Sequence, residues 1–164
     1  MSAKASAKKK LASKKRAPAK AAKKRSGVDP KLLDRLVQEA AAVREHAYAP
    51  YSRYQVGAAI ATKSGRVFTG CNVENASLGA TICAERGAVM QMIAAGEREP
   101  IACAVVTGDE EPASPCGICR QVLAEFAPDM PIVLVGQGSK DGETGRVVGL
   151  GELLPLQFRL LNRH

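Results

Sequence analysis

Apolar residues recur at helical spacing where the chain first becomes rich in large apolar side chains. From residue 32 onward they recur singly or in adjacent pairs every three or four positions, which predicts an amphipathic helix. Asp29 suits the N-cap of this helix and Pro30 its first position. The helix should end before Pro50, because the residue that precedes a proline avoids helical geometry. The predicted apolar face consists of Leu32, Leu33, Leu36, Val37, Ala40, Val43 and Ala47.

The rest of the chain alternates between short apolar runs and longer helical stretches. Ser64-Gly65, between the first two runs, is typical of a hairpin turn. Strands that alternate with helices favour an α/β sheet that is covered on both faces. The predicted strands are 54–61, 66–71, 101–107, 131–135 and 146–149, and the predicted helices are 83–95 and 116–126, with a short final segment from Glu152.

Positive charge is concentrated before the first predicted helix. The formal net charge is +8, from 24 Lys and Arg against 16 Asp and Glu, but residues 1–27 hold eleven of the basic residues and no acid. The remainder has 13 basic and 16 acidic residues, a net charge of −3. Residues 1–27 are rich in Lys, Ala and Ser and cannot bury enough apolar surface to order themselves. We therefore predict a disordered basic tail at 1–27 and one folded domain at 28–164.

The basic tail has three open interpretations. It resembles the Lys/Ala/Pro-rich tails of linker histones, which indicates non-specific contact with the phosphates of nucleic acids. It also fits a solvated tail without a partner, or a targeting segment, although transit peptides favour Arg over Lys. A membrane is not expected as a partner, since no apolar run reaches the length of about 20 residues that crosses a bilayer.

The five cysteines divide into a group of three and two others. Two short motifs hold the three: Cys83-Ala84-Glu85-Arg86 and Pro115-Cys116-Gly117-Ile118-Cys119-Arg120. Cys71 and Cys103 lie in strand-like stretches and are expected to be buried free thiols. The odd number of cysteines and the lack of a signal-peptide apolar region before them predict the cytoplasm, where thiols stay reduced.

The two motifs together supply three thiolates at the start of two predicted helices. Three protein ligands leave the fourth position of Zn²⁺ open for water, as in catalytic zinc sites. Unpaired N–H groups at a helix N-terminus stabilise thiolates and so assist ligand deprotonation. Three thiolates outweigh the charge of Zn²⁺ by one. We therefore expect Arg86 and Arg120 to offset that charge by hydrogen bonds to sulfur.

Glu85 is the candidate proton carrier of this site. A carboxylate close to the water could move protons from water to a ring nitrogen and to a leaving amine. It could also be an ordinary first-turn Glu that the helix dipole favours. A structural zinc site would need Cys71, Cys103 or His46 as fourth ligand, and none stands at zinc-ribbon spacing. His46 is more typical of a helix-end surface residue, and Pro115 with the third cysteine argues against a redox C-x-x-C pair.

Five stretches of the chain carry a resemblance to a known family: 49–59 (APYSRYQVGAA), 70–76 (GCNVENA), 83–86 (CAER), 114–121 (SPCGICRQ) and 153–155 (LLP) with Phe158. In this order they resemble the small, homotetrameric, three-cysteine cytidine deaminases. The resemblance implies a three-layer α/β/α sandwich with a mixed five-stranded sheet, and one Zn²⁺ per subunit on Cys83, Cys116 and Cys119. It implies hydrolytic deamination of cytidine and 2′-deoxycytidine in pyrimidine salvage, with Glu85 as the proton carrier.

The resemblance also implies a nucleoside pocket that is shared between subunits. From its residues alone, the loop at 72–75 is an ordinary polar loop as readily as a hydroxyl-binding one. The implied substrate contacts are Asn72 and Glu74 at the ribose hydroxyls, the backbones of Ala84 and Ser114 at the base edge, Tyr54 in the pocket wall, and Phe158 at the base of a neighbouring subunit.

The chain departs from the family pattern at three places. The family usually has Phe at the position of Tyr54 and often Tyr at the position of Leu78. The basic tail is not part of the family's usual pattern. Residues 152–156 are also similar to blasticidin S deaminases. Two classes of alternative therefore stay open. The first is a deaminase of a modified nucleoside such as blasticidin S or of a base in polynucleotide. The second is a zinc-stabilised nucleic-acid-binding protein that acts through its tail.

Overall fold

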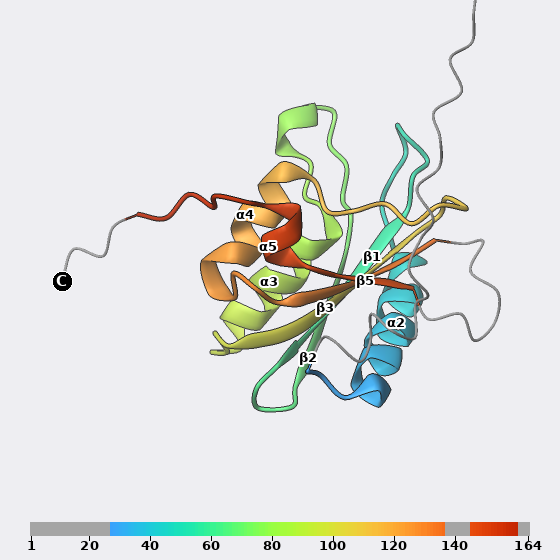
Figure 1. Cartoon of the computed structure of the whole chain (residues 1–164). Coiled ribbons are helices and arrows are strands. Elements are labelled where there is room, and N and C mark those ends of the chain that lie inside the picture. Colours follow the sequence, from blue (N-terminus) through green and yellow to red (C-terminus); the bar gives the residue numbers. More distant parts are fainter. Residues whose placement is uncertain (1–26, 137–144, 161–164) are drawn as a thin grey trace, which may run out of the picture.

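A mixed five-stranded sheet organises the chain (Figure 1). The computed structural model describes residues 27–136 and 145–160, so the predicted tail lies outside it except for Gly27. The strand order is β2-β1-β3-β4-β5; β3 and β4 are parallel and the other neighbours antiparallel. The strands are β1 (Val56–Thr62), β2 (Val67–Cys71), β3 (Pro100–Thr107), β4 (Pro131–Val135) and β5 (Arg146–Gly149).

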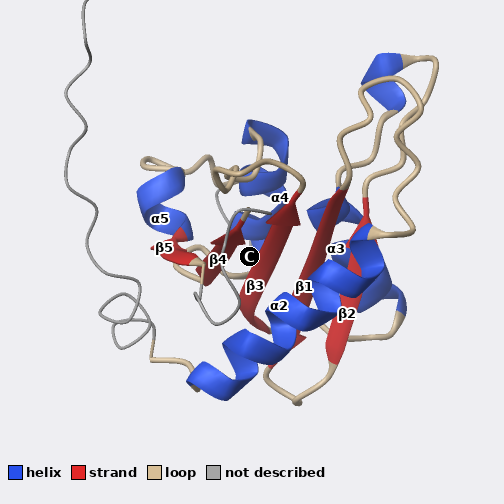
Figure 2. Ribbon diagram, turned by 90° about the vertical axis from the view of Figure 1, so that its right-hand side faces the viewer, coloured by secondary structure: helices blue, strands red, loops and turns tan. Residues whose placement is uncertain are grey.

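Helices cover both faces of this sheet (Figures 1 and 2). The helix α2 (Pro30–Arg44) lies on one face; α3 (Ala84–Ala94), α4 (Gly117–Phe126) and the short α5 (Leu150–Leu153) lie on the other. A 3₁₀ turn, η1 (Leu78–Ala80), precedes α3. The predicted three-layer α/β/α arrangement is confirmed. Within the described residues, no helix is long and apolar enough to cross a bilayer.

Alternation along the strands divides the core into two layers. In β1, Ala58 and Ile60 are buried against the α3 and α4 side, whereas Ala59 and Ala61 are buried against α2. Successive side chains of a strand point to opposite faces, so an unbroken apolar run is what a doubly covered sheet requires. Both layers consist mainly of Ala, Val, Ile and Leu, and the small alanines of β1 allow the helices to approach the sheet closely.

The predicted caps and turns lie where local chemistry favours them. Asp29 caps α2 and accepts a hydrogen bond from the Lys31 amide at 2.9 Å. Gly65 and Gly96 have φ of +87° and +83°, the left-handed conformation that glycine adopts without strain, in the hairpin and after α3. Beyond the end of α2 the exposed His46 leads into residue Tyr48, whose amide donates to the Asn72 carbonyl at 3.0 Å.

Gly70 allows β2 to pack directly against α3, the helix that begins at the first cysteine motif. A Cβ at this position would lie 2.4 Å from the Ala88 nitrogen and 2.5 Å from the Ala84 oxygen. We expect Gly70→Ala to lower the free energy of unfolding by about 1–3 kcal/mol, because the backbone of α3 must move. Chemical denaturation measures this. Gly79→Ala, where a Cβ meets nothing within 4 Å, is the control, and equal stability of the two variants would contradict the expectation.

Candidate metal centre and active site

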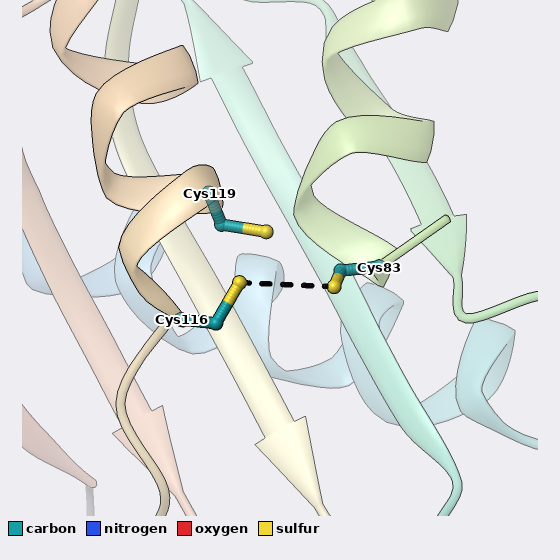
Figure 3. A group of neighbouring side chains, drawn as sticks. All are labelled: Cys83, Cys116 and Cys119. Atoms are coloured by element: carbon teal, nitrogen blue, oxygen red, sulfur yellow. Dashed lines mark hydrogen bonds between the residues drawn. The ribbon is translucent and has the colours of Figure 1, made fainter. Parts of the chain in front are cut away.

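Three cysteines from two helix N-termini meet on one side of the sheet (Figure 3). Cys83 is the N-cap of α3, Cys116 is the N-cap of α4, and Cys119 lies in the first turn of α4. Their sulfur atoms all lie within 4.8 Å of one another. The Sγ atoms of Cys83 and Cys116 are 3.9 Å apart. Within residues 27–136 and 145–160, this is the one group of three or more Cys, His, Asp or Glu side chains close enough to share a metal ion.

The geometry of the cluster fits Zn²⁺. A tetrahedral ion with Zn–S bonds of about 2.3 Å holds its sulfur ligands about 3.8 Å apart, close to the observed 3.9 Å. Neither Cys83 nor Cys116 uses its side chain to cap its helix, so both sulfurs are available. No fourth ligand-type side chain of the described residues joins the group. The cluster therefore has the three-ligand composition of a catalytic zinc site rather than the closed set of a structural one.

Arg86 provides the positive charge nearest to these sulfurs. Its Nη2 donates to the Thr81 carbonyl and to Cys83 Sγ, the latter at 4.0 Å. A hydrogen bond with Cys119, together with Arg86, lowers the pKa of the Cys83 thiol to about 5. The same pairing, with burial, raises the pKa of Cys119. Without metal, the cluster therefore holds its first negative charge on Cys83, beside the guanidinium.

Arg120 differs from the prediction that it bonds to sulfur. Its guanidinium donates to the Pro115 carbonyl at 2.7 Å, the Ser114 hydroxyl at 2.7 Å and the Leu153 carbonyl at 2.8 Å. These acceptors draw the fork away from the cysteines, because carbonyl and hydroxyl oxygens accept stronger hydrogen bonds than sulfur. Arg120 thus contacts the loop that carries Cys116, and not the ligand atom itself.

Glu85 is buried in the first turn of α3, with 4% of its surface exposed. Burial raises the pKa of its carboxyl group, and the negative charge of Cys83 adds to that effect. A carboxyl group with a raised pKa takes up and releases protons more readily near neutral pH than an ordinary Glu. Cys103 lies fully buried on β3, and burial, with the charge of Glu85, raises its pKa. Cys103 is thus a buried thiol as predicted, whereas Cys71 is only half-buried.

Asn72 is buried at the end of β2, where it joins two segments of backbone. Its Oδ1 accepts from the Val56 amide at 2.8 Å, and its Nδ2 donates to the Tyr54 carbonyl at 2.8 Å. An amide group has two N–H donors, so one donor of Nδ2 remains for a ligand. The structure therefore gives Asn72 a positioning role in addition to the implied contact with ribose.

Glu74 is held by the loop that precedes β1. Its Oε2 accepts from the amides of Tyr51 at 2.9 Å and Ser52 at 3.2 Å, and its Oε1 accepts from the Ser52 hydroxyl. The Ser52 hydroxyl, followed by the two amides, lowers the pKa of the Glu74 carboxyl. The carboxylate therefore stays ionised and oriented. Ser52 had no role in the sequence-based prediction, although it lies within the APYS part of a stretch that carries the family resemblance.

Tyr54 lies half-buried beside β3, where its additional hydroxyl has polar neighbours. The register pairs Val56 with Thr107, and two positions further out this register sets Tyr54 opposite Asp109. Burial raises the pKa of the hydroxyl, and the neighbouring Thr107 and Asp109 also act on it. The hydroxyl that distinguishes Tyr54 from the usual Phe thus lies next to polar groups of the protein.

The other implied substrate contacts differ in their exposure. Ala84 is buried at the first position of α3, next to Cys83, and Ser114 is exposed two residues before Cys116. Phe158 lies on the segment after α5 with 69% of its surface exposed, and its carbonyl accepts from Gln121 Nε2 at 3.0 Å. In a single chain, the Phe158 ring is therefore free to contact another molecule.

Comparisons with known proteins agree with this geometry. The family model of the cytidine and deoxycytidylate deaminase zinc-binding region matches residues 30–135. A cytidine deaminase of Halalkalibacterium halodurans is 47% identical over 124 residues, 75% of this chain and 91% of that protein. The crystal structure of cytidine deaminase from Burkholderia pseudomallei is similar with a TM-score of 0.71 and 48% identity, over 76% of this chain and 98% of that one.

A more distant relative bears on the choice of substrate. The blasticidin-S deaminase of Bacillus cereus is 30% identical over 115 residues, 65% of this chain and 79% of that protein. The cytidine deaminase of Halalkalibacterium halodurans thus matches this chain with higher identity and over a larger share of it. With the zinc-type cysteine cluster and the buried Glu85 in the same fold, this chain belongs to the cytidine and deoxycytidylate deaminase family.

Proposed function

We propose that this protein is a zinc-dependent hydrolase that converts cytidine and 2′-deoxycytidine to uridine and 2′-deoxyuridine with release of ammonia. The observation that carries the proposal is the cluster of Cys83, Cys116 and Cys119 with Glu85 buried in the same helix turn. This arrangement occurs in a chain that is 47% identical to a cytidine deaminase over most of its length.

The three cysteines are the residues that would hold Zn²⁺, one ion per chain. When bound, Zn²⁺ supplies a Lewis acid that makes water nucleophilic at neutral pH. Three thiolates donate much negative charge and would weaken this effect. Arg86 counters it, because its guanidinium donates to Cys83 Sγ and draws electron density from that sulfur.

Glu85 carries the protons of the reaction. It takes one from the attacking water and delivers it to N3 of the cytosine ring while the C4–O bond forms. It then takes the remaining proton of that water, now on the C4 hydroxyl, and gives it to the amino group. The C4–N bond breaks and ammonia leaves. One carboxyl group can serve each transfer in turn because burial raises its pKa above that of an ordinary Glu.

The polar loop at 72–75 supports a free nucleoside as substrate. The remaining Nδ2 donor of Asn72 and the ionised carboxylate of Glu74 would bind the ribose hydroxyls. The backbones of Ala84 and Ser114 would bind the base edge, and Tyr54 would line the pocket. A nucleotide within a polynucleotide has its 3′ oxygen esterified, so a pocket that grips this hydroxyl favours a nucleoside.

A homotetramer would complete the pocket with Phe158 from a neighbouring chain. Large apolar side chains that are exposed on the described surface are available for such an association. A site of three reduced thiols also favours the cytoplasm, where uridine production would serve pyrimidine salvage. The exposed side chains include Leu78, Met90, Ile118, Leu156 and Phe158.

The basic tail supports a second, accessory role in contact with nucleic acid. Residues 1–27 hold eleven Lys and Arg and no acid, against a net charge of −3 on the remainder. Such a segment neutralises phosphates without reading sequence, and its affinity falls steeply as salt rises. In this proposal the tail is separate from the catalytic domain at 28–164.

One experiment tests these proposals together. The full chain and a form without residues 1–27 are given cytidine, blasticidin S and a cytosine-containing single-stranded oligonucleotide. We expect both forms to lower cytidine absorbance at similar rates, to contain about one zinc per chain, and to leave the oligonucleotide unchanged. Fluorescence anisotropy should show salt-sensitive DNA binding by the full chain alone.

Three results of this experiment would contradict the proposals separately. Absence of cytidine turnover in both forms excludes the proposed catalytic function. Turnover of the oligonucleotide or of blasticidin S that is faster than turnover of cytidine excludes a free cytidine nucleoside as the main substrate. DNA binding that survives the deletion excludes the role of the tail. Light scattering on the same samples tests assembly, because a homotetramer has four times the mass of the 17.3 kDa chain.

A further inference from the structure

Arg120 joins three parts of the chain at the edge of the cysteine cluster. It lies in α4, one residue after Cys119, and its side chain turns back toward the helix start. Nε donates to the Pro115 carbonyl and Nη2 to the Ser114 hydroxyl, each at 2.7 Å. Nη1 donates to the Leu153 carbonyl at 2.8 Å, 33 residues away at the end of α5.

These bonds hold the two residues that immediately precede Cys116. Pro115 is buried, so its carbonyl needs a protein partner, and Arg120 Nε supplies it. The Arg120 amide donates to the Cys116 carbonyl at 3.0 Å. Residue Cys116 is thus bracketed by the backbone and the side chain of one arginine, although it is itself exposed and has no capping bond.

The segment that carries the Leu153 carbonyl is itself bonded to α4 and to the turn that follows it. Leu150 donates through its amide to the Met130 carbonyl at 2.9 Å, four residues after the end of α4, and this bond fixes the start of α5. Gln121, next to Arg120, donates to the Phe158 carbonyl at 3.0 Å. The Leu153 carbonyl therefore belongs to a segment fixed at two points, and it gives the guanidinium a firm support.

We propose that Arg120 is a positioning residue that fixes the Ser114–Cys116 loop to α5 and so holds Cys116 in place beside Cys83 and Cys119. The inference rests on the proposed zinc site. Cys119 is buried within the first turn of α4, and the N-cap Cys83 accepts a hydrogen bond from Arg86. Cys116 is exposed at the junction of loop and helix. Loosening this loop releases Cys116 first, and a metal ion held by the cluster dissociates faster.

The role depends on the shape of the guanidinium and not on its charge. Three nitrogen atoms in a rigid plane reach three acceptors in three directions, whereas lysine has a single nitrogen on a flexible stem. Arg120→Lys therefore keeps the positive charge near the cluster and removes the fork. If Arg120 acted through its charge, this variant would behave like the wild type.

The test measures zinc release from the purified, zinc-loaded full chain into an excess of a chromogenic chelator. We expect Arg120→Lys to release zinc about 10–100 times faster than the wild type, the range found when groups that support metal ligands are changed. Arg35→Lys is the matched control: Arg35 lies on α2, on the opposite face of the sheet, where it has a 3.8 Å contact with Glu39. Its release rate should equal that of the wild type. A release rate of Arg120→Lys equal to that of the wild type overturns the proposal.

Ser114→Ala provides an independent variant that removes a single acceptor of the fork. We expect it to release zinc about 2–10 times faster, because the fork loses one of its hydrogen bonds. In the double variant with Arg120→Lys the two effects should fall short of their product, because both act through one contact. Multiplicative effects overturn the proposal. If Arg120→Lys does not fold, unchanged release from Ser114→Ala overturns it and faster release supports it.

The release measurement needs no substrate, so it separates this proposal from the proposed function. A wild type that holds zinc but does not convert cytidine contradicts the function, while the comparison of release rates still tests Arg120. A loss of thermal stability in Arg120→Lys without faster release indicates a purely structural role and overturns the proposal.

Discussion

Replacement of Glu85 by Gln should reduce kcat for cytidine by a factor of about 10²–10⁴ while the protein keeps its zinc. Gln has nearly the shape of Glu but cannot accept a proton from water or return one to the ring. Glu85 is buried at the start of α3 with only 4% of its surface exposed, in the same turn as Cys83. The loss should therefore appear mainly in kcat, since the side chain acts on the reacting atoms.

The decrease in cytidine absorbance and the zinc content of the same sample measure this prediction. Glu125→Gln is the matched control, because Glu125 is exposed on α4, and it should retain full activity. Glu85→Asp should recover part of the rate, since it restores a carboxyl group at a shorter reach. Full activity of Glu85→Gln would remove Glu85 from the mechanism, and loss of zinc together with activity would make its role structural.

The same variant has an expected effect on stability. Burial raises the pKa of Glu85 in the folded chain above its unfolded value. The folded state then favours the protonated form, so ionisation of this group opposes folding as pH rises through the folded pKa, and the penalty is complete above it. Gln removes the charge. We therefore expect the metal-free variant to be no less stable than the metal-free wild type at pH 7 in chemical denaturation.

Replacement of Cys119 by Ser should remove zinc and activity together. Cys119 is the fully buried member of the cluster, so no water-exposed group can move in to replace its sulfur. A Ser hydroxyl is a hard, protonated and shorter ligand that binds Zn²⁺ poorly. We expect zinc content to fall from about one per chain to a small fraction, and deamination to fall with it.

Cys103→Ser is the matched control for this change. Cys103 is as buried as Cys119 but lies on β3 outside the cluster, where its thiol donates to the Ala104 carbonyl at 3.6 Å. A Ser hydroxyl can make the same bond, so this variant should keep its zinc. Elemental analysis after gel filtration measures both variants. Equal zinc content in Cys119→Ser and the wild type would show that the cluster is not the zinc site.

Local elements were predictable because their signals lie close together in the sequence. The helix that Asp29 caps, the hairpin at Gly65 and the end of α3 at Gly96 each depend on a few neighbouring residues. The two cysteine motifs were equally local, since C-x-E and P-C-x-x-C specify ligand types within single turns. These short-range patterns predicted the covered sheet, the three candidate ligands and the proton carrier.

The contacts between these local units depend on the sheet topology. Parallel pairing of β3 with β4 and the antiparallel pairing of β1 with β3 place α3 beside α4. Only then do the sulfurs of Cys83 and Cys116, 33 residues apart, approach to 3.9 Å. Apolar alternation says which face a strand buries, but it does not specify the neighbour of each strand.

The partners of polar side chains follow from the same long-range arrangement. The sequence predicted that Arg120 donates a hydrogen bond to a cysteine sulfur, because it follows Cys119. The folded chain instead brings the Leu153 carbonyl within 2.8 Å of Arg120 Nη1. It likewise places Ser52 against Glu74 and Asp109 against Tyr54. A long polar side chain bonds to whichever acceptors the packed backbone brings within reach. The sequence therefore determined the chemistry of this centre, and the tertiary packing determined which groups support it.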